Sequence, residues 1–513
     1  MEATGFDAWA LSLAVFLPLL GALVMMTVPK EQEETHKLIA LGSSLAALAV
    51  GIYLLAQFDF DNSSELQFLV DNSWIDVINS RYIVGLDGLS LPLLILSLVV
   101  VPLCIIYSWD HIPEPGNAKA FLMLILVLAT GMNGTFVSQD LILFFVFFEV
   151  VLLPMYFLIG VWGGPDRKYA SLKFFLYTLF GSALMIISFI AVFILSGDHL
   201  GESTFDMRAL SAWAGEGLSL TTAVVIFGGM FMGFGIKVPM FPFHTWLPDA
   251  HTQAPTVGSV ILAAVLLKLG TYGFVRIAIP ILPEAAVEWA PWIGLLAVIG
   301  IIYGALGCLA QTDMKRLIAF SSVAHMGYVM LGIATLTDFG INAAVFGMVA
   351  HGLITGMLFF VAGSVKERYH TLEIARLGGL LKSAPRMGWI LGFATMASLG
   401  LPGLAGFWGE FPAILAAYQP AEGLSEELFR VYMVVAAIGT VLAAGYLLWL
   451  YQRTSFGEPT EEFADEEIAD VGRFEWIAWS PFLLAIVVFG VYPNLLFSVT
   501  DDTVGQLLSA LGG

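Results

Sequence analysis

Long apolar runs joined by short polar connectors dominate the chain, and this pattern predicts its elements. A helix of about 20 apolar residues crosses the hydrocarbon of a bilayer, so each run is long enough for one crossing. Fourteen spanning segments are expected near residues 9–28, 38–56, 87–108, 117–134, 139–160, 171–196, 221–240, 257–278, 290–310, 317–336, 340–365, 388–417, 430–452 and 476–497. Membrane barrels use alternating strands of roughly ten residues, which these runs do not resemble. The predicted fold is all-α: residues 1–513 form one polytopic membrane domain of about 14 transmembrane helices.

Composition agrees with a membrane protein. Of the 513 residues, 58% are hydrophobic and only 12% are charged, too few to cover a water-soluble surface. Glu2 and Asp7 precede the first apolar run, whereas Lys30 and Lys37 follow it. A cleavable signal peptide has the opposite charge order, so the first run is expected to remain as a helix.

The basic residues predict the orientation, because cytoplasmic loops of membrane proteins carry an excess of lysine and arginine. If the chain starts outside, the inner side receives Lys30, Lys37, Lys119, Arg167, Lys168, Lys173, Lys315, Arg316, Lys366, Arg368, Arg376, Lys382, Arg386, Arg453 and Arg473. The outer side receives only Arg81, Arg208, Arg276 and Arg430. Both termini are therefore predicted to face outward. The net charge of −20 does not oppose this, since acidic residues contribute little to the rule.

Four ionisable residues lie inside apolar runs, namely Glu149, Lys237, Lys268 and Glu410. Charges at such depth are costly and usually functional. Each also has a structural interpretation: Glu149 as a protonated carboxyl, and Lys237 as a cap for carbonyl groups freed by the following prolines. Lys268 has no break beside it, so it is the strongest single indication of a proton path.

These groups have the chemistry of a proton relay. A glutamate and a lysine in one apolar bundle are expected to compensate each other, so moving Glu149 would switch Lys237 between holding and releasing a proton. Histidine has an unperturbed pKa near neutrality, so His325 and His351 suit proton transfer between the ends of the path. Either histidine could instead be a satisfied structural residue, and the pair could also hold a haem.

Two helices are expected to be broken in a similar way. Prolines Pro239 and Pro242 follow Lys237, and Pro402 and Pro412 flank a glycine-rich stretch with Glu410. A broken membrane helix frees carbonyl groups that need protein or water beside them. Paired breaks with ionisable residues are typical of transporters built from two repeats. The alternative is two unrelated proline kinks.

Several chemistries are excluded for this chain alone. Its two cysteines, Cys104 and Cys308, are far apart, and an iron–sulfur cluster needs four protein ligands. Neither a dinucleotide-binding GxGxxG unit nor a GxxxxGK[ST] phosphate loop is present in the sequence. Any redox chemistry that drives this protein is expected to occur in partner chains.

Three stretches carry a resemblance to a known family. They are SQDLILFFVFFEVVLLPMYFLIG (138–160), KVPMFPFHTWLPDAHTQAPTVGSVILAAVLLKLGTYG (237–273) and SSVAHMGYVMLG (321–332). They resemble the antiporter-like membrane subunits of respiratory complex I, most of all the branch called M in bacteria and chain 4 in mitochondria. The resemblance covers nearly the whole chain.

The resemblance implies two inverted five-helix repeats, 117–278 and 290–452, each with a discontinuous helix. It implies a proton-transfer role for Glu149 and Lys237 as a modulating pair, Lys268 as a connecting lysine, His325 and His351 on a central axis, and Glu410 as the terminal acid. No cofactor or metal is expected in this chain; FMN, iron–sulfur clusters and quinone are expected in partner subunits. The implied partners are other membrane-arm subunits, above all two sister antiporter-like chains, and the lipid of a bacterial plasma membrane, with no nucleic acid.

Two other functions remain open from the sequence. Subunits of multisubunit sodium/proton antiporters share this fold and much of the motif set. A third interpretation makes the chain a scaffold whose buried charges only hold helices together.

Overall fold

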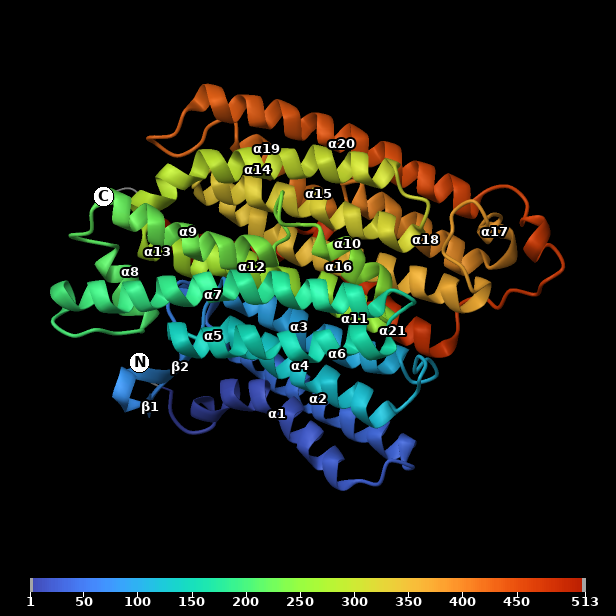
Figure 1. Cartoon of the computed structure of the whole chain (residues 1–513), viewed down its shortest axis with the longest axis horizontal. Coiled ribbons are helices and arrows are strands. Elements are labelled where there is room, and N and C mark those ends of the chain that lie inside the picture. Colours follow the sequence, from blue (N-terminus) through green and yellow to red (C-terminus); the bar gives the residue numbers. More distant parts are fainter. Residues whose placement is uncertain (1–2, 510–513) are drawn as a thin grey trace.

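A computed structural model describes residues 3–509, and its helices run side by side along the long axis of the molecule (Figure 1). Thirteen stretches are long and apolar enough to cross a membrane. They are α1 (Asp7–Thr27), α2 (Glu33–Gln57), α3 (Ser90–Tyr107), α4 (Ala118–Val137), α5 with α6 (Leu141–Val150 and Leu152–Trp162), α7 (Arg167–Leu200), α9 (Leu220–Lys237), α11 to α13 (Thr256–Ile281), α14 (Pro283–Leu309), α15 (Met314–Ala334), α16 (Asp338–Tyr369), α20 (Glu426–Ser455) and α21 (Arg473–Val491).

Thirteen of the predicted segments coincide with these spans. The remaining one, 388–417, consists of two shorter helices, α18 (Pro385–Ser398) and α19 (Ala405–Ala416). The other short helices are α8 (Met207–Trp213), α10 (Trp246–Gln253), α17 (Leu380–Ser383), α22 (Asn494–Leu508), η1 (Phe60–Asn62), η2 (Asp76–Ile78) and η5 (Glu461–Phe463).

The helix interruptions predicted from the prolines are present. α9 ends at Lys237, and α10 begins only at Trp246. The Trp246 indole N–H donates to the backbone oxygen of Ile236 at 2.9 Å, which satisfies a carbonyl group at the broken end. In the second break, Gly400 and Gly403 adopt φ of +74° and +93°, a conformation that glycine reaches without steric cost.

The expectation of a purely helical fold was wrong for residues 67–86. They form an antiparallel hairpin of β1 (Gln67–Ile75) and β2 (Ser80–Leu86), with Asn79 in the left-handed region at the turn. Asp140, which caps α5, accepts hydrogen bonds from the Ser80 hydroxyl and the Arg81 backbone N–H, both at 3.0 Å. The hairpin is therefore attached to the helical bundle by a side chain that also starts a helix.

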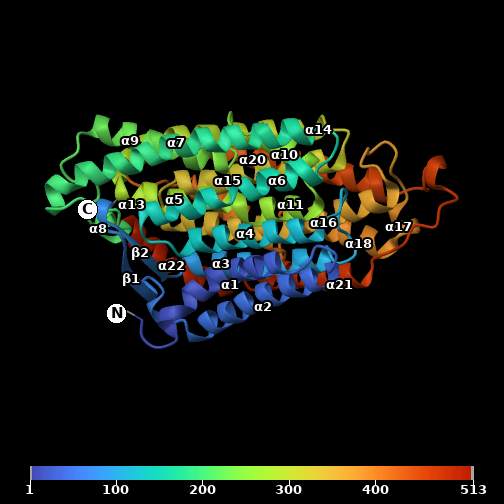
Figure 2. The same ribbon diagram turned by 60° about the horizontal axis from the view of Figure 1, so that its bottom comes forward.

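The first and last parts of the described chain meet at this hairpin. The backbone N–H of Ala3 donates to the oxygen of Leu69 at 2.9 Å, and the Thr503 hydroxyl donates to the oxygen of Ser63 at 2.8 Å. Figure 2 shows β1, β2 and α22 together at one end of the bundle, with α17 at the other. We call these the hairpin end and the loop end.

The carboxylate of Asp71 is held by two arginines at the hairpin end. Arg81 and Arg208 donate to it at 2.6 and 2.7 Å. Burial favours the neutral acid, but these two guanidinium groups outweigh it and lower the pKa of Asp71. The hairpin and α8 are thereby joined by a charged network outside the membrane-spanning helices.

The span over 256–281 departs from regular α-helix twice. Two π-helical turns, η3 (Leu262–Leu266) and η4 (Phe274–Ala278), lie between α11 (Thr256–Ile261), α12 (Leu267–Gly273) and α13 (Ile279–Ile281). Hydrogen bonds in a π turn join residues five apart, and such turns occur frequently at functional sites. This helix is completely surrounded by the others.

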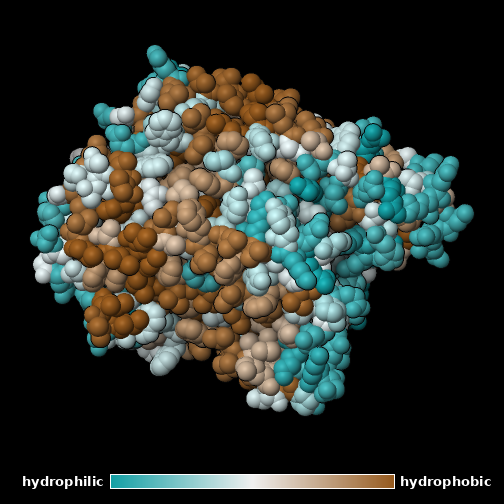
Figure 3. Space-filling view, viewed as in Figure 1, coloured by the Kyte–Doolittle hydropathy of each residue, from teal (hydrophilic) through white to brown (hydrophobic). Residues whose placement is uncertain are grey.

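The outer surface suits a lipid environment. Large apolar side chains point outward from several spans, among them Trp9, Val225, Trp389 and Val441. In Figure 3 apolar residues cover much of the visible face, while hydrophilic ones gather at the loop end. An exposed apolar surface of this extent marks a membrane protein.

Gly270→Ala is expected to destabilise the protein by about 1–3 kcal/mol, the usual cost of overpacking a core. A Cβ there would lie 2.6 Å from the backbone oxygen of Phe234 and 2.8 Å from Cγ2 of Val238, forcing α12 away from α9. Gly445→Ala is the matched control, since a Cβ there meets nothing within 4 Å. Thermal unfolding in mild detergent measures both variants, and equal stability of the two would contradict the close packing.

Candidate functional site

Lys268 is a fully buried lysine that is held by two partners. Its Nζ donates to the backbone oxygen of Ala263 at 2.5 Å and lies 2.8 Å from Nδ1 of His351. Ala263 belongs to the π turn η3, where backbone hydrogen bonds join residues five apart. The turn and α16 together fix the amino group against an imidazole.

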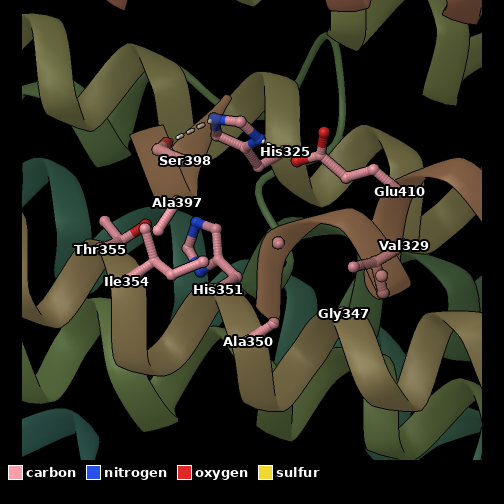
Figure 4. Close-up of a pocket in the computed structure, with 12 residues that line it drawn as sticks. His325, Val329, Gly347, Ala350, His351, Ile354, Thr355, Ala397, Ser398 and Glu410 are labelled. Atoms are coloured by element: carbon pink, nitrogen blue, oxygen red, sulfur yellow. Dashed lines mark hydrogen bonds and ion pairs between the residues drawn. The ribbon is translucent and has the colours of Figure 1, made fainter. Parts of the chain in front are cut away.

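His351 and His325 lie on adjacent helices, with ring centroids 6.1 Å apart. Both line a cavity of about 20 Å³ together with Thr355, Ser398 and Glu410 (Figure 4). A cavity holds a water molecule when it offers at least about 10–15 Å³, so this one has room for one. Among the described residues, Nε2 of His351 has no hydrogen-bond partner. Space for one water molecule therefore lies between the two histidines, beside Nε2 of His351.

Beyond the cavity, His325 contacts an acid. Its Nδ1 lies 2.5 Å from Oε1 of Glu410, while its Nε2 lies 3.2 Å from the Ser398 hydroxyl and 3.3 Å from the Tyr446 hydroxyl. Ser398 ends α18 and Glu410 lies on α19. The second helix break therefore places one polar group at each nitrogen of His325.

A close helix crossing sets the position of Glu410. A Cβ added to Gly409 would lie 2.5 Å from Cα of Gly347, so α19 and α16 touch through their backbones. This close crossing places Glu410 inside the bundle, where its side chain is only 14% exposed. Lys268, His351, His325 and Glu410 thus lie in one row, which we call the relay. Its two ends are the Lys268–His351 and His325–Glu410 contacts, and the water-sized cavity lies between the two histidines.

The geometry is incompatible with a haem between His325 and His351. The space between their rings is about 20 Å³, far below the several hundred Å³ of an ordinary ligand pocket. Both nitrogens of His325 already have polar partners, so neither is free to ligate iron. The haem interpretation that the sequence left open is wrong.

Glu149 and Lys237 do not form an ion pair within the part of the chain that the structure describes. Glu149 instead accepts a hydrogen bond from the Ser182 hydroxyl at 2.5 Å. The Lys237 Nζ is buried, lies 4.4 Å from the ring centroid of Phe148 and has no hydrogen-bond partner among residues 3–509. Neither residue is joined to the relay by a direct hydrogen bond.

An additional buried ion pair was not foreseen from the sequence. Arg276 was counted among the basic residues of the outer side, but it lies buried in η4, where its Nη2 contacts both carboxylate oxygens of Asp87 at 2.6 Å. Its Nε also donates to the Tyr272 hydroxyl at 3.2 Å. The partners are 189 positions apart, so no local pattern could have joined them.

Two further buried groups lie toward the loop end. Lys315, assigned from sequence to a connector, is only 2% exposed and donates to the oxygen of Ala254 at 2.5 Å. His251, on the same short helix as Gln253, is fully buried and stacks on Phe359 with centroids 4.4 Å apart. Within the described chain, neither ring nitrogen of His251 has a partner.

A wider cavity opens beside Lys315 at the loop end. It measures about 610 Å³ and is lined by Lys315, Glu367 and His111 among others. His111 lies in the connector after α3, where burial lowers its pKa. The cavity therefore brings polar side chains and space for solvent close to α10, the short helix that carries His251.

Comparisons with known proteins agree along the chain. A family model described as NADH:quinone oxidoreductase/Mrp antiporter, TM, matches residues 138–441, and one described as NADH-ubiquinone oxidoreductase chain 4, amino terminus, matches residues 13–135. NADH-quinone oxidoreductase subunit M of Rickettsia prowazekii is 40% identical, covering 97% of this chain and 98% of that protein. The protein of the same name in Rhodobacter capsulatus is also 40% identical, covering 97% and 96%.

Solved structures give the same result for the fold. A chain of respiratory complex I from Thermus thermophilus matches with a TM-score of 0.86 at 29% identity, covering 98% of this chain and all of that one. A chain of the Mrp complex from Dietzia sp. DQ12-45-1b matches with a TM-score of 0.84 at 20% identity, covering 99% of this chain and 100% of that one, and shares the fold. The chain therefore belongs to the family of NADH:quinone oxidoreductase membrane subunits named subunit M or chain 4.

Proposed function

We propose that this chain is a proton-translocating subunit in the membrane arm of an NADH:quinone oxidoreductase. Its relatives at 40% identity are named NADH-quinone oxidoreductase subunit M, and they match over almost their full length. The observation that carries the proton-transfer role is the relay, in which Lys268, His351, His325 and Glu410 follow one another through the buried interior. Each member can hold or release a proton, and a purely structural row would not need four titratable groups.

The relay would work through changes of local charge. Quinone reduction in a partner subunit alters charge at one end of the membrane arm, and the change passes to Glu149 and Lys237. Because Lys237 lacks a hydrogen-bond partner in the described chain, its proton affinity depends on how near Glu149 stands. A shift at Lys237 then acts on Lys268 and drives its proton toward His351, His325 and Glu410.

We assign the loop end to the inner side of the membrane, with both termini outside. The cavity of about 610 Å³ at the loop end supports proton uptake there, with Lys315 and His251 between it and Lys268. Glu410, on the partly exposed α19, supports release toward the outer side. The placement agrees with the excess of basic residues in the connectors assigned to the inner side.

The same placement implies an even number of crossings. Both ends of the described chain contact the segment 63–69, whereas the thirteen continuous spans alone would leave them on opposite sides. The α18 and α19 pair supplies the fourteenth crossing. We further infer that 117–278 and 290–452 are inverted repeats, since each contains one interrupted helix next to an ionisable residue.

The redox cofactors belong to partner chains in this scheme. FMN, iron–sulfur clusters and quinone would be held by other subunits, and two sister antiporter-like subunits would flank this chain in a bacterial plasma membrane. A sodium/proton antiporter is the second candidate, because the Mrp complex shares the fold. Lysine as a central carrier favours protons, since an ammonium cannot ligate a metal cation. Identifying the proteins that co-purify with this chain in mild detergent distinguishes the two functions. Flavin and iron–sulfur proteins are expected if the chain belongs to an NADH:quinone oxidoreductase.

Glu410→Gln tests the relay most directly. The amide keeps the size and hydrogen-bonding capacity but cannot release a proton, and a positioned proton-transfer group is worth about 10²–10⁴-fold. We expect proton movement per quinone reduced, measured in liposomes with a pH-sensitive dye, to fall at least about tenfold. The exposed Glu461→Gln is the control. Unchanged pumping by an assembled Glu410→Gln complex would refute the relay.

A further inference from the structure

A groove away from the relay lies between α2, α3, α16, α21 and α22. Its volume is about 1130 Å³, which exceeds the ~300–1,000 Å³ of a typical small-ligand pocket. Its floor is apolar and buried, with Leu96, Val349, Leu353 and Phe482 each no more than 6% exposed. Such a surface fits hydrocarbon.

The groove has one polar end. Five polar side chains line the groove where α21 ends and α22 begins, namely Asp61, Tyr492, Asn494, Ser498 and Asp502. All five are exposed, and all belong to segments at the hairpin end. The groove is therefore amphipathic along its length, with an open polar mouth and an apolar floor.

The length of the groove matches one leaflet of a bilayer. Along α21 it runs from Pro481 to Phe489, and Tyr492 lies just beyond the helix. At about 1.5 Å per residue the stretch from Pro481 to Tyr492 measures roughly 15 Å, about half of the ~30 Å hydrocarbon core. A transmembrane helix of a partner would need the full thickness, whereas an acyl chain needs only this half.

The mouth carries negative charge. Asp61 and Asp502 are both exposed there, and none of the described residues that line the groove is lysine or arginine. Burial together with the carboxylates of Asp502 and Asp338 raises the pKa of Asp501 beside it. An anionic headgroup would be repelled at this position, while an ammonium group would be attracted.

We propose that this groove is a binding site for a zwitterionic, ammonium-bearing phospholipid such as phosphatidylethanolamine, in the leaflet at the hairpin end. Its acyl chains lie over Leu96, Val349 and Phe482, and its ammonium faces Asp61 and Asp502. The Asn494 amide and the Tyr492 hydroxyl are placed to donate hydrogen bonds to the phosphate. The site is separate from the relay and goes beyond proton transfer.

Lipid retention by the intact complex tests the proposal. The complex is equilibrated with vesicles of equal phosphatidylethanolamine and phosphatidylglycerol, extracted in mild detergent, and its bound lipids are counted by mass spectrometry. Ala485→Trp fills the groove and is expected to reduce retained phosphatidylethanolamine at least fivefold. Leu484→Trp is the matched control, because Leu484 is the preceding residue, is 66% exposed and lies outside the groove.

A second variant tests the headgroup without changing the shape of the groove. Asp61→Asn combined with Asp502→Asn is expected to lower the preference for phosphatidylethanolamine over phosphatidylglycerol by roughly threefold to tenfold, since exposed ion pairs are individually weak. An unchanged preference overturns the assignment of the headgroup. Equal loss with Leu484→Trp, or cross-linking of the Ala485→Cys variant to a partner protein instead of lipid, overturns the site itself.

Discussion

Lys268→Met abolishes coupled proton transfer in this scheme, and it is the variant with the largest expected effect. Methionine nearly matches the length and apolar stem of lysine, so the packing inside the fully buried helix is retained. What is lost is the amino group that contacts both the Ala263 carbonyl and His351. We expect at least about a hundredfold loss of proton movement in liposomes, in the range of a removed proton-transfer group.

Leu269→Met is the matched control for this variant. Leu269 is the next residue on α12, is equally buried and cannot titrate. Assembly is checked by native gel electrophoresis, so that loss of the complex is not mistaken for loss of transfer. If Lys268→Met pumps normally in an assembled complex, the scaffold interpretation of the buried charges is correct and the relay is not.

Lys237→Met is expected to lower proton movement without lowering the stability of the protein. A buried polar group without a hydrogen-bond partner costs about 1–3 kcal/mol, and Lys237 Nζ is such a group within the described chain. Its replacement is expected to leave the thermal unfolding temperature unchanged or higher, while proton movement per quinone falls at least about tenfold. Only a residue kept for its titration behaves in this way.

Lys168→Met provides the comparison for Lys237→Met, because Lys168 is exposed on the first turn of α7. It should change neither the unfolding temperature nor proton movement. A strongly destabilised Lys237→Met protein would instead mean that the ammonium holds α9 in place. That outcome would remove Lys237 from the path but leave the row from Lys268 to Glu410 intact.

The spans were predictable from hydropathy, because a segment that crosses lipid must be apolar and must pair its own backbone groups, as a helix does. The interruptions after Lys237 and before Glu410 were predictable for a similar reason, since proline removes a backbone donor wherever it stands. The hairpin over 67–86 was not. Its apolar positions are interrupted by aspartate, asparagine and serine, so the segment has the composition of a connector, and its pairing depends on contacts with distant residues such as Asp140.

For the site, the sequence named candidate residues but not their neighbours. His325 and Glu410 are 85 positions apart, and their contact depends on how α15 and α19 are rotated. The same holds for Glu149, whose partner is Ser182 on another helix. Rotation is set by packing details such as the glycine crossing of α16 and α19, and one sequence does not report those.

The π turns η3 and η4 also say how this chain could change in length. Each accommodates one residue more than an α-helix needs over the same rise. A single-residue deletion within either turn would restore regular helix while both flanks keep their phase. Deletion at η3 would shift the Ala263 carbonyl and so disturb one of the two contacts of Lys268. The segment can therefore lose one residue and remain a helix, but the contacts of Lys268 would not stay the same.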